Sequence, residues 1–287
     1  MIKALVILVW PAGIAAILAV TALLAKRPDL PASPATAPMN GHRGSESAVT
    51  VNPRSARSSI TGLLLILAVG AVLVYALTVL LGMLVVHGGP TIDKPLYTWT
   101  IHYRWLLWTS VMDRVTKVGD TWTVWGAAAA AAVCLAALYR KNKWLPPVAL
   151  GAAILLDHYL TLALRYTFAR PGPPDSPDGT FPSGGCDRIV VFYGLIAYLI
   201  WREVSGSRRR AIWAAGVVGT LGFSEAYSRG YLTLHWLTDI ISGLVYGGLI
   251  LAVFIGAIRL VDGPARKLVP DVPSHPAVSG RHAPAPQ

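Results

Sequence analysis

The sequence predicts an all-α integral membrane protein, with a core of six transmembrane helices and one extra helix at the N-terminus. Composition is the first reason: 54% of the 287 residues are hydrophobic and 14% are charged, whereas a typical soluble domain has about 25% charged residues. The second reason is a series of apolar runs, most of them near the roughly 20 residues that a helix needs to cross a bilayer. Backbone groups in lipid must pair within their segment, so each run is expected to be a helix. The runs cover residues 4–25, 61–87, 121–139, 145–164, 189–202, 211–227 and 239–260.

Two segments lack this apolar character and divide the chain. Residues 26–60 are rich in Pro, Ser, Ala and Gly, which is typical of a flexible linker. Residues 261–287 contain repeated prolines, which block regular structure, so a disordered tail is expected there. The predicted organisation is a transmembrane helix at 1–25, a cytoplasmic linker, a membrane domain at 61–260 and a cytoplasmic tail.

The first helix has two interpretations. Lys3 precedes its apolar run, and the small residues Ala35 and Ala37 follow, as in a cleaved signal peptide. Cleavage would leave the basic linker on the outer side, against the charge rule for membrane topology. A retained signal anchor is therefore the favoured interpretation.

The basic residues indicate how the chain is oriented in the membrane. The formal net charge is +11, but the excess lies in short segments between apolar runs, which is typical of topology signals and not of nucleic-acid binding. Such segments face the cytoplasm. Residues 88–120, 166–188 and 228–238 are then expected on the outer side of the plasma membrane, together with the N-terminus. The basic segments contain Arg140, Lys141 and Lys143, then Arg202, Arg208, Arg209 and Arg210, then Arg259, Arg266 and Lys267.

Aromatic and charged residues alternate through residues 88–120. This pattern is typical of an amphipathic helix that lies in the headgroup region. Such a helix would anchor the protein at the interface and would also help to cover a lipid-entry site. The aromatic residues are Tyr97, Trp99, Tyr103, Trp105 and Trp108.

The strongest chemical signal is the run from Ser228-Arg229 through His235 to Asp239. If 229–239 is largely helical, His235 and Asp239 lie one turn apart on one face. A carboxylate there would hold one imidazole nitrogen and leave the other to attack as a nucleophile. Arg229 offers a planar fork of donors that suits phosphate oxygens.

A second cluster lies between two apolar runs on the same predicted side of the membrane. Arg170-Pro171 ends one run, and Pro182-Ser183-Gly184 begins the next. A serine and a glycine at a helix start present a hydroxyl and backbone N–H groups to an anion. A snorkelling arginine and a simple helix cap are the structural alternatives.

These clusters resemble the PAP2 (type 2 phosphatidic acid phosphatase) family, whose pattern is K-x6-R-P, then P-S-G-H, then S-R-x5-H-x3-D on a six-helix core. The resemblance covers about residues 61–260, including Asp93 and Gly119-Asp120, near which family members often carry similar short motifs. It implies a membrane lipid phosphatase that needs no metal or other cofactor, with His235 as the nucleophile that forms a phosphohistidine and Asp239 as the residue that orients it. The residues that would hold the phosphate are Arg170, Ser183, Gly184 and Arg229.

The chain departs from the family pattern at two positions. Ala163 stands where the family has lysine, and Arg165 is a substitute cation nearby. Gly185 stands where the family has the histidine that gives a proton to the leaving group, and glycine is no acid. Asp187 is the candidate replacement donor, although its carboxyl would need a strongly raised pKa.

Two acidic residues lie inside apolar runs, where an ionised group is costly without a partner. Glu225 is one turn before Arg229 and is expected to orient it. Asp157 is expected to have a partner on another helix. The adjacent His158 is expected to be a packing residue.

The resulting prediction is an enzyme that acts on a lipid phosphate or diphosphate through His235 and transfers the phosphoryl group to water or to a second substrate. The expected partners are a phosphorylated lipid and the bilayer, with no metal site. Without an acid at Gly185, a diphosphate such as a polyprenyl diphosphate is favoured, because its leaving group is a weak base. The alternative is a catalytically impaired relative that binds phosphorylated lipid without turnover.

Overall fold

The computed structural model describes residues 2–26, 53–174, 176, 181–204 and 207–262. The described part of the chain is helical, as predicted. Its helices are α1 (Ile2–Lys26), α2 (Pro53–Gly88), α3 (Pro90–Tyr103), α4 (Leu106–Val115), the 3₁₀ turn η1 (Thr116–Gly119), α5 (Thr121–Leu138), α6 (Leu145–Phe168), α7 (Gly184–Arg188), the π-helical segment η2 (Ile189–Tyr193), α8 (Gly194–Val204), α9 (Arg208–Tyr231) and α10 (Leu237–Asp262).

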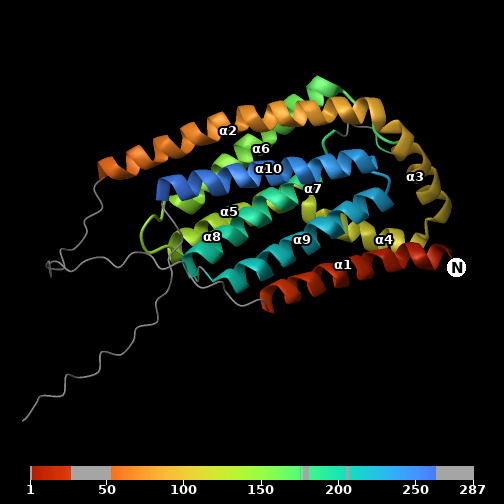
Figure 1. Ribbon diagram of the computed structural model, residues 1–287, viewed down its shortest axis with the longest axis horizontal. Coiled ribbons are helices and arrows are strands. Elements are labelled where there is room, and N and C mark those ends of the chain that lie inside the picture. The colour runs from red at the N-terminus through yellow and green to blue at the C-terminus, as the bar shows by residue number, and fades with distance from the viewer. Residues whose placement is uncertain (1, 27–52, 175, 177–180, 205–206, 263–287) are drawn as a thin grey trace, which may run out of the picture.

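The long helices lie side by side as a bundle (Figure 1). Helix α1 packs along α9, α2 packs along α10, and α5 packs against α6. Helices α3 and α4 lie across the right-hand end of the bundle in Figure 1, and α9 ends and α10 begins at that end. The connections α5–α6 and α8–α9 lie at the opposite end, so the basic segments are separated from the predicted site by the length of the bundle.

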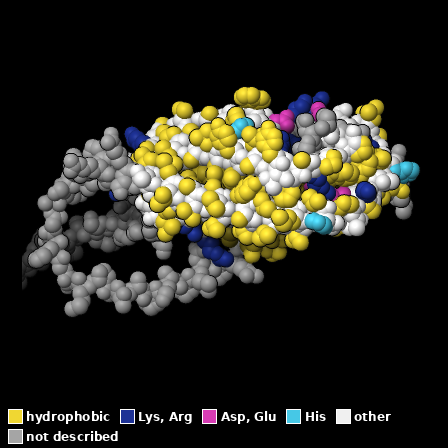
Figure 2. Space-filling view, turned by 90° about the horizontal axis from the view of Figure 1, so that it is seen from above, with side chains coloured by type: hydrophobic (Ala, Val, Ile, Leu, Met, Phe, Trp, Pro, Cys, Tyr) yellow, Lys and Arg dark blue, Asp and Glu magenta, His cyan; other side chains and the backbone are white. Residues whose placement is uncertain are grey.

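Six of the described helical segments are long and apolar enough to cross a membrane. Helix α9 has 24 residues but is not among these segments; it begins with three arginines and also contains Glu225 and Arg229. Figure 2 shows hydrophobic side chains over much of the face that it presents, with acidic and basic side chains together in the right-hand half. The six segments are Ile7–Lys26, Ile60–Gly88, Thr121–Leu138, Leu145–Phe168, Gly184–Val204 and Leu237–Val261.

The segment Gly184–Val204 lies at the centre of the bundle. Its apolar window is 61% buried, against 33% or less for the other five segments. Phe192 and Leu195 on this segment are fully buried, as are Tyr246 and Phe254 on α10. The predicted 189–202 helix is therefore longer than expected and begins inside the protein at Gly184.

The extra N-terminal helix is packed closely against the bundle. Gly13 on α1 lies against the ring of Phe223, and Gly216 on α9 lies against Thr21. A side chain at either glycine would overlap its neighbour, so these small residues allow the two helices to approach.

Two predicted boundaries were wrong. Helix α2 begins at Pro53, before the predicted start at residue 61, so the last part of the expected linker is helical. The 88–120 segment forms two helices and a 3₁₀ turn instead of one amphipathic helix, with an extended break at Arg104 and Trp105. Residues 27–52 of the expected linker and residues 263–287 of the expected tail lie outside the described residues.

Candidate functional site

The three predicted motif segments meet at the end of the bundle that α3 and α4 cover. They are the segment after α6, the start of α7 and the turn between α9 and α10. Residues far apart in the sequence are joined here by side-chain contacts: Arg170 reaches Asp93 and Asp239. The three motif segments therefore lie together at one end of the bundle, and the side of the membrane that this end faces stays a prediction.

The prediction that 229–239 is largely helical was wrong. Helix α9 ends at Tyr231, and α10 begins only at Leu237. Thr233, in the turn between them, has a positive φ of 55°, which a helix cannot continue through. His235 thus precedes α10 and Asp239 lies in its first turn, so the two side chains are not one turn apart on a single helix.

His235 lies beside Arg229. Its Nε2 is 3.3 Å from Nη1 of Arg229, so this nitrogen faces the guanidinium that was predicted to hold phosphate. The orientation of the ring by Asp239 stays a prediction. Asp239 is fully buried, and its Oδ1 accepts a short hydrogen bond from Arg170.

Arg229 is held by carboxylates on two sides. Its Nε donates a short hydrogen bond to Glu225 Oε1, one turn earlier on α9, as the sequence spacing predicted. Its Nη2 donates to Asp120 Oδ1 at 3.4 Å, and Thr116 donates to the same Glu225 oxygen at 3.3 Å. Because Glu225 is 1% and Arg229 is 8% exposed, this is a buried ion pair. Removing either partner would leave a buried, unpaired charge, which destabilises the fold.

The guanidinium of Arg229 fills the space beside Gly185. A Cβ atom on residue 185 would overlap Nε, Cζ and Nη2 of Arg229. Any larger residue at 185, the family's histidine included, would have to displace a side chain that Glu225 and Asp120 hold in place. The glycine is therefore matched to the position of the arginine.

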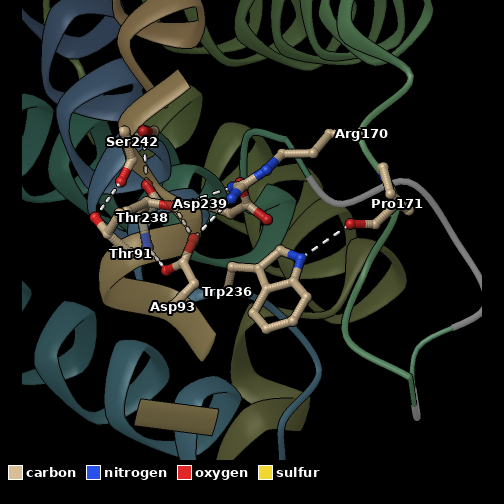
Figure 3. Close-up of polar contacts among 9 residues, drawn as sticks. Thr91, Asp93, Arg170, Pro171, Trp236, Thr238, Asp239 and Ser242 are labelled. Carbon is tan, nitrogen blue, oxygen red and sulfur yellow. Dashed lines mark hydrogen bonds and ion pairs between the residues drawn. The ribbon is translucent and has the colours of Figure 1, made fainter. Parts of the chain in front are cut away.

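Arg170 lies at the centre of a second ion-pair network (Figure 3). Its Nη2 pairs with Asp93 Oδ2 at 2.7 Å, while its Nη1 pairs with Asp239 and donates to Thr238 Oγ1 at 3.0 Å. Thr238 in turn donates to Asp93 from its backbone N at 3.0 Å and from its hydroxyl at 2.6 Å. The network joins α3, the segment after α6 and α10. The contacts of Arg170 are thus to carboxylates and a hydroxyl, and its role in phosphate binding stays a prediction.

Ser183 and Gly184 are fully packed at the start of α7. The backbone N of Ser183 donates to the carbonyl of Asp239 at 3.1 Å, which joins α7 to α10. A Cβ atom on Gly184 would lie 3.0 Å from Nη1 of Arg188 and 3.2 Å from Nη2 of Arg165. Arg165, the predicted substitute cation, therefore does reach a predicted phosphate-binding residue.

Asp187, the candidate proton donor, contacts α6. It is fully buried, and its Oδ2 accepts a hydrogen bond from Thr161 on α6 at 3.4 Å. Asp157, also on α6, lies close enough to interact with it electrostatically, and Arg188 acts on both carboxylates. Asp157 thus interacts electrostatically with Arg188 on another helix, without a salt bridge between them among the described residues. No contact seen in the described residues supports Asp187 as the acid.

An apolar pocket of about 290 Å³ opens beside His235. Its walls come from α1, α3, the end of α9 and the start of α10, and its polar members include His235 and Asp93. Among the described residues, no three His, Cys, Asp or Glu side chains are grouped closely enough to ligate one metal ion. The remaining lining residues are mainly apolar or aromatic, among them Val9, Leu96, Trp99, Tyr227, Trp236 and Ile240.

Sequence reasoning missed the contacts of three residues of this region. Thr238 was not singled out, and Asp120 was noted only as part of the family resemblance, because each acts on an arginine that is remote in the sequence. Arg188 was also missed, although it follows Gly184 by four residues and so lies on the same helical face. That spacing is a signal that the sequence did contain.

Comparison with known proteins agrees with the geometry. The family model described as "PAP2 superfamily" matches residues 146–260. A solved structure, "the first transmembrane PAP2 type phosphatidylglycerolphosphate phosphatase from Bacillus subtilis", has the same fold, with a TM-score of 0.58 and 20% sequence identity over 65% of this chain and 94% of that one. A search of curated proteins found no match. The predicted resemblance to the PAP2 family is thereby confirmed over residues 146–260, which the family model matches.

Proposed function

We propose that the chain is a membrane lipid phosphatase or phosphotransferase that acts on a lipid phosphate or diphosphate through a phosphohistidine at His235. The observation that carries the proposal is the position of this residue: its Nε2 is 3.3 Å from Arg229, and it also lines the apolar pocket. A phosphorylated lipid has the same two halves, an anion for the arginine and an apolar chain for the pocket. The PAP2 match supports the same assignment.

The chemistry takes two steps. First, Nε2 of His235 attacks phosphorus, a P–N bond forms, and the P–O bond to the leaving group breaks with its electron pair on oxygen. Arg229 stabilises the charge on the phosphoryl oxygens in this step. Second, water or an acceptor hydroxyl attacks phosphorus, the P–N bond breaks, and its electron pair returns to Nε2. The proton of the attacking group passes to the product phosphate or to solvent.

The Arg170 network is assigned a positioning role. By pairing with Asp93 on α3 and Asp239 on α10, Arg170 fixes the start of α10 immediately after His235. The hydrogen bond from Trp236 Nε1 to the Pro171 carbonyl, at 2.9 Å, ties down the same turn (Figure 3). The turn that carries the nucleophile is thus held from two sides.

The substrate class that we favour is a lipid diphosphate. A monophosphate ester expels an alkoxide, which needs a proton, whereas a diphosphate expels a phosphate monoester, a much weaker base. A general acid is worth about 10²–10⁴-fold. Since Gly185 supplies none and Asp187 is directed toward Thr161, substrates that need no acid should be favoured.

The absence of an acid at Gly185 also favours a second candidate function, that of a relative that binds phosphorylated lipid without turnover. Phosphate release by the purified protein separates the two. Release from phosphatidate or farnesyl diphosphate that disappears in His235→Ala supports the enzyme. Saturable lipid binding with no release from either substrate supports the binding protein.

The site is assigned to the outer face of the plasma membrane. The support is its position at the end of the bundle opposite the α5–α6 and α8–α9 connections. The first connection carries Arg140, Lys141 and Lys143, and α9 begins directly after the second with Arg208 and Arg209. Basic connections of this kind are retained in the cytoplasm.

A further inference from the structure

A second cavity, with a polar lining, lies beside the candidate site, on the other side of the glycine pair Gly184-Gly185. Its volume is about 450 Å³, and it lies where α5, α6 and α7 meet, at the same end of the bundle as His235. Gly185 borders Arg229, whereas its neighbour Gly184 borders the arginines of this cavity. The residues that line it are Thr121, Trp122, Trp125, Asp157, His158, Thr161, Leu162, Arg165 and Arg188.

The cavity contains positive charge that the protein does not neutralise by close ion pairs. Within the described part of the chain, neither Arg165 nor Arg188 has a carboxylate at salt-bridge distance, and Arg165 is exposed. Arg188 uses its Nε to donate to the Gly119 carbonyl at 3.1 Å, which orients its guanidinium. Charged side chains inside membrane helices are costly and mark ligand sites. Asp157 and Asp187 interact electrostatically with both arginines but lie beyond salt-bridge distance, so the two guanidinium groups keep N–H donors for an anion.

The cavity also contains a buried acceptor and a buried donor that the described chain leaves unsatisfied. Asp157 is 2% exposed, and its Oδ1 has no hydrogen-bond partner in the described residues. The indole Nε1 of Trp125 is also buried and has no hydrogen-bond partner among the described residues. Such groups cost free energy unless something bonds to them. A hydroxyl satisfies both, because it donates to a carboxylate and accepts from an indole N–H.

We propose that this cavity binds an anionic polyol, meaning a phosphorylated group with free hydroxyls such as glycerol phosphate. The arginines hold the phosphate, Asp157 and Trp125 bond to the hydroxyls, and the exposed indole of Trp122 covers the apolar face of the carbon chain. The group is either a lipid headgroup or a free polyol phosphate. The proposal concerns binding only and does not depend on phosphotransfer at His235.

The test measures binding in His235→Ala protein, which removes turnover but leaves the cavity intact. Titration calorimetry in detergent compares sn-glycerol 3-phosphate with inorganic phosphate, glycerol and phosphoethanolamine. Glycerol 3-phosphate should bind most tightly, and Arg165→Gln should weaken it about tenfold. Arg140→Gln, which loses the same charge at the opposite end of the bundle, should leave it unchanged. Equal binding by the two variants, or tighter binding of phosphoethanolamine, would overturn the proposal.

The hydroxyl contacts are tested by Trp125→Phe, which keeps the ring and removes the donor. It should lower affinity for glycerol 3-phosphate severalfold and leave that for inorganic phosphate unchanged, whereas a loss for both ligands would contradict the assignment. The lipid source is tested by native mass spectrometry with phosphatidylglycerol and phosphatidylcholine. Retention of phosphatidylglycerol that depends on Arg165 identifies a headgroup site, and binding of the soluble ligand alone identifies a free polyol phosphate. If neither phosphatidylglycerol nor glycerol 3-phosphate binds, the proposed site is overturned, and the proposal for His235 is unaffected.

Discussion

Gly185 and Arg229 are matched in space: the guanidinium of the arginine occupies the volume into which a side chain at residue 185 would project. The site therefore requires a glycine at this position to leave room for Arg229. The same glycine also means that residue 185 cannot act as the acid. Arg229 is fixed by Glu225 and Asp120, so it has little freedom to move aside.

Gly185→Ala should therefore lower phosphate release on the order of 10²-fold, because the methyl group displaces the arginine that stabilises the phosphoryl oxygens. Gly185→His should be at least as damaging and should not restore an acid. The control is Gly248→Ala on α10, whose added Cβ atom meets nothing within 4 Å. Higher monophosphate turnover in Gly185→His would show that Arg229 moves aside and that our assignment is wrong.

A substitution at Arg170 tests whether this residue stabilises the fold or binds the phosphate. Its pairs with Asp93 and Asp239 are buried, so Arg170→Gln should reduce the free energy of unfolding by about 3–5 kcal/mol. Thermal unfolding in detergent measures this. The control is Lys117→Gln, which breaks an exposed pair with Asp113 and should change stability little. Unchanged stability with a raised KM in Arg170→Gln would identify the residue as a phosphate ligand instead.

Substrate preference tests the leaving-group argument. The native protein should turn over a polyprenyl diphosphate faster than phosphatidate, by a factor within the 10²–10⁴-fold that an acid would supply. Asp187→Asn should leave the ratio unchanged, because Asp187 faces Thr161. A preference for phosphatidate that disappears in Asp187→Asn would place the acid at Asp187.

The topology is tested by cysteine labelling, after Cys134 and Cys186 are replaced by alanine. A cysteine at Ser176 should react with an impermeant thiol reagent in intact cells, because it follows α6 at the end that carries the site. A cysteine at Asn142, in the connection between α5 and α6, should be protected. The reverse pattern would place the site on the cytoplasmic side.

The sequence predicted what depends on local pattern. The apolar runs identified the long helices, and the spacing of Glu225 and Arg229 identified their ion pair, because both are properties of one segment. The break between α9 and α10 was missed, since a turn at Thr233 is not visible in the S-R-x5-H-x3-D spacing alone. The partners of Arg170 were missed because Asp93 lies 77 residues away in the chain and meets it only through packing.

The central claim is that His235 carries the phosphoryl group, and trapping the intermediate tests it most directly. The protein is mixed with a ³²P-labelled lipid diphosphate, quenched in alkali within a fraction of a turnover, and digested to locate the label. Our account predicts base-stable, acid-labile label on the peptide that contains His235, and none in His235→Ala. Turnover without any labelled peptide, or label that persists in His235→Ala, would contradict it.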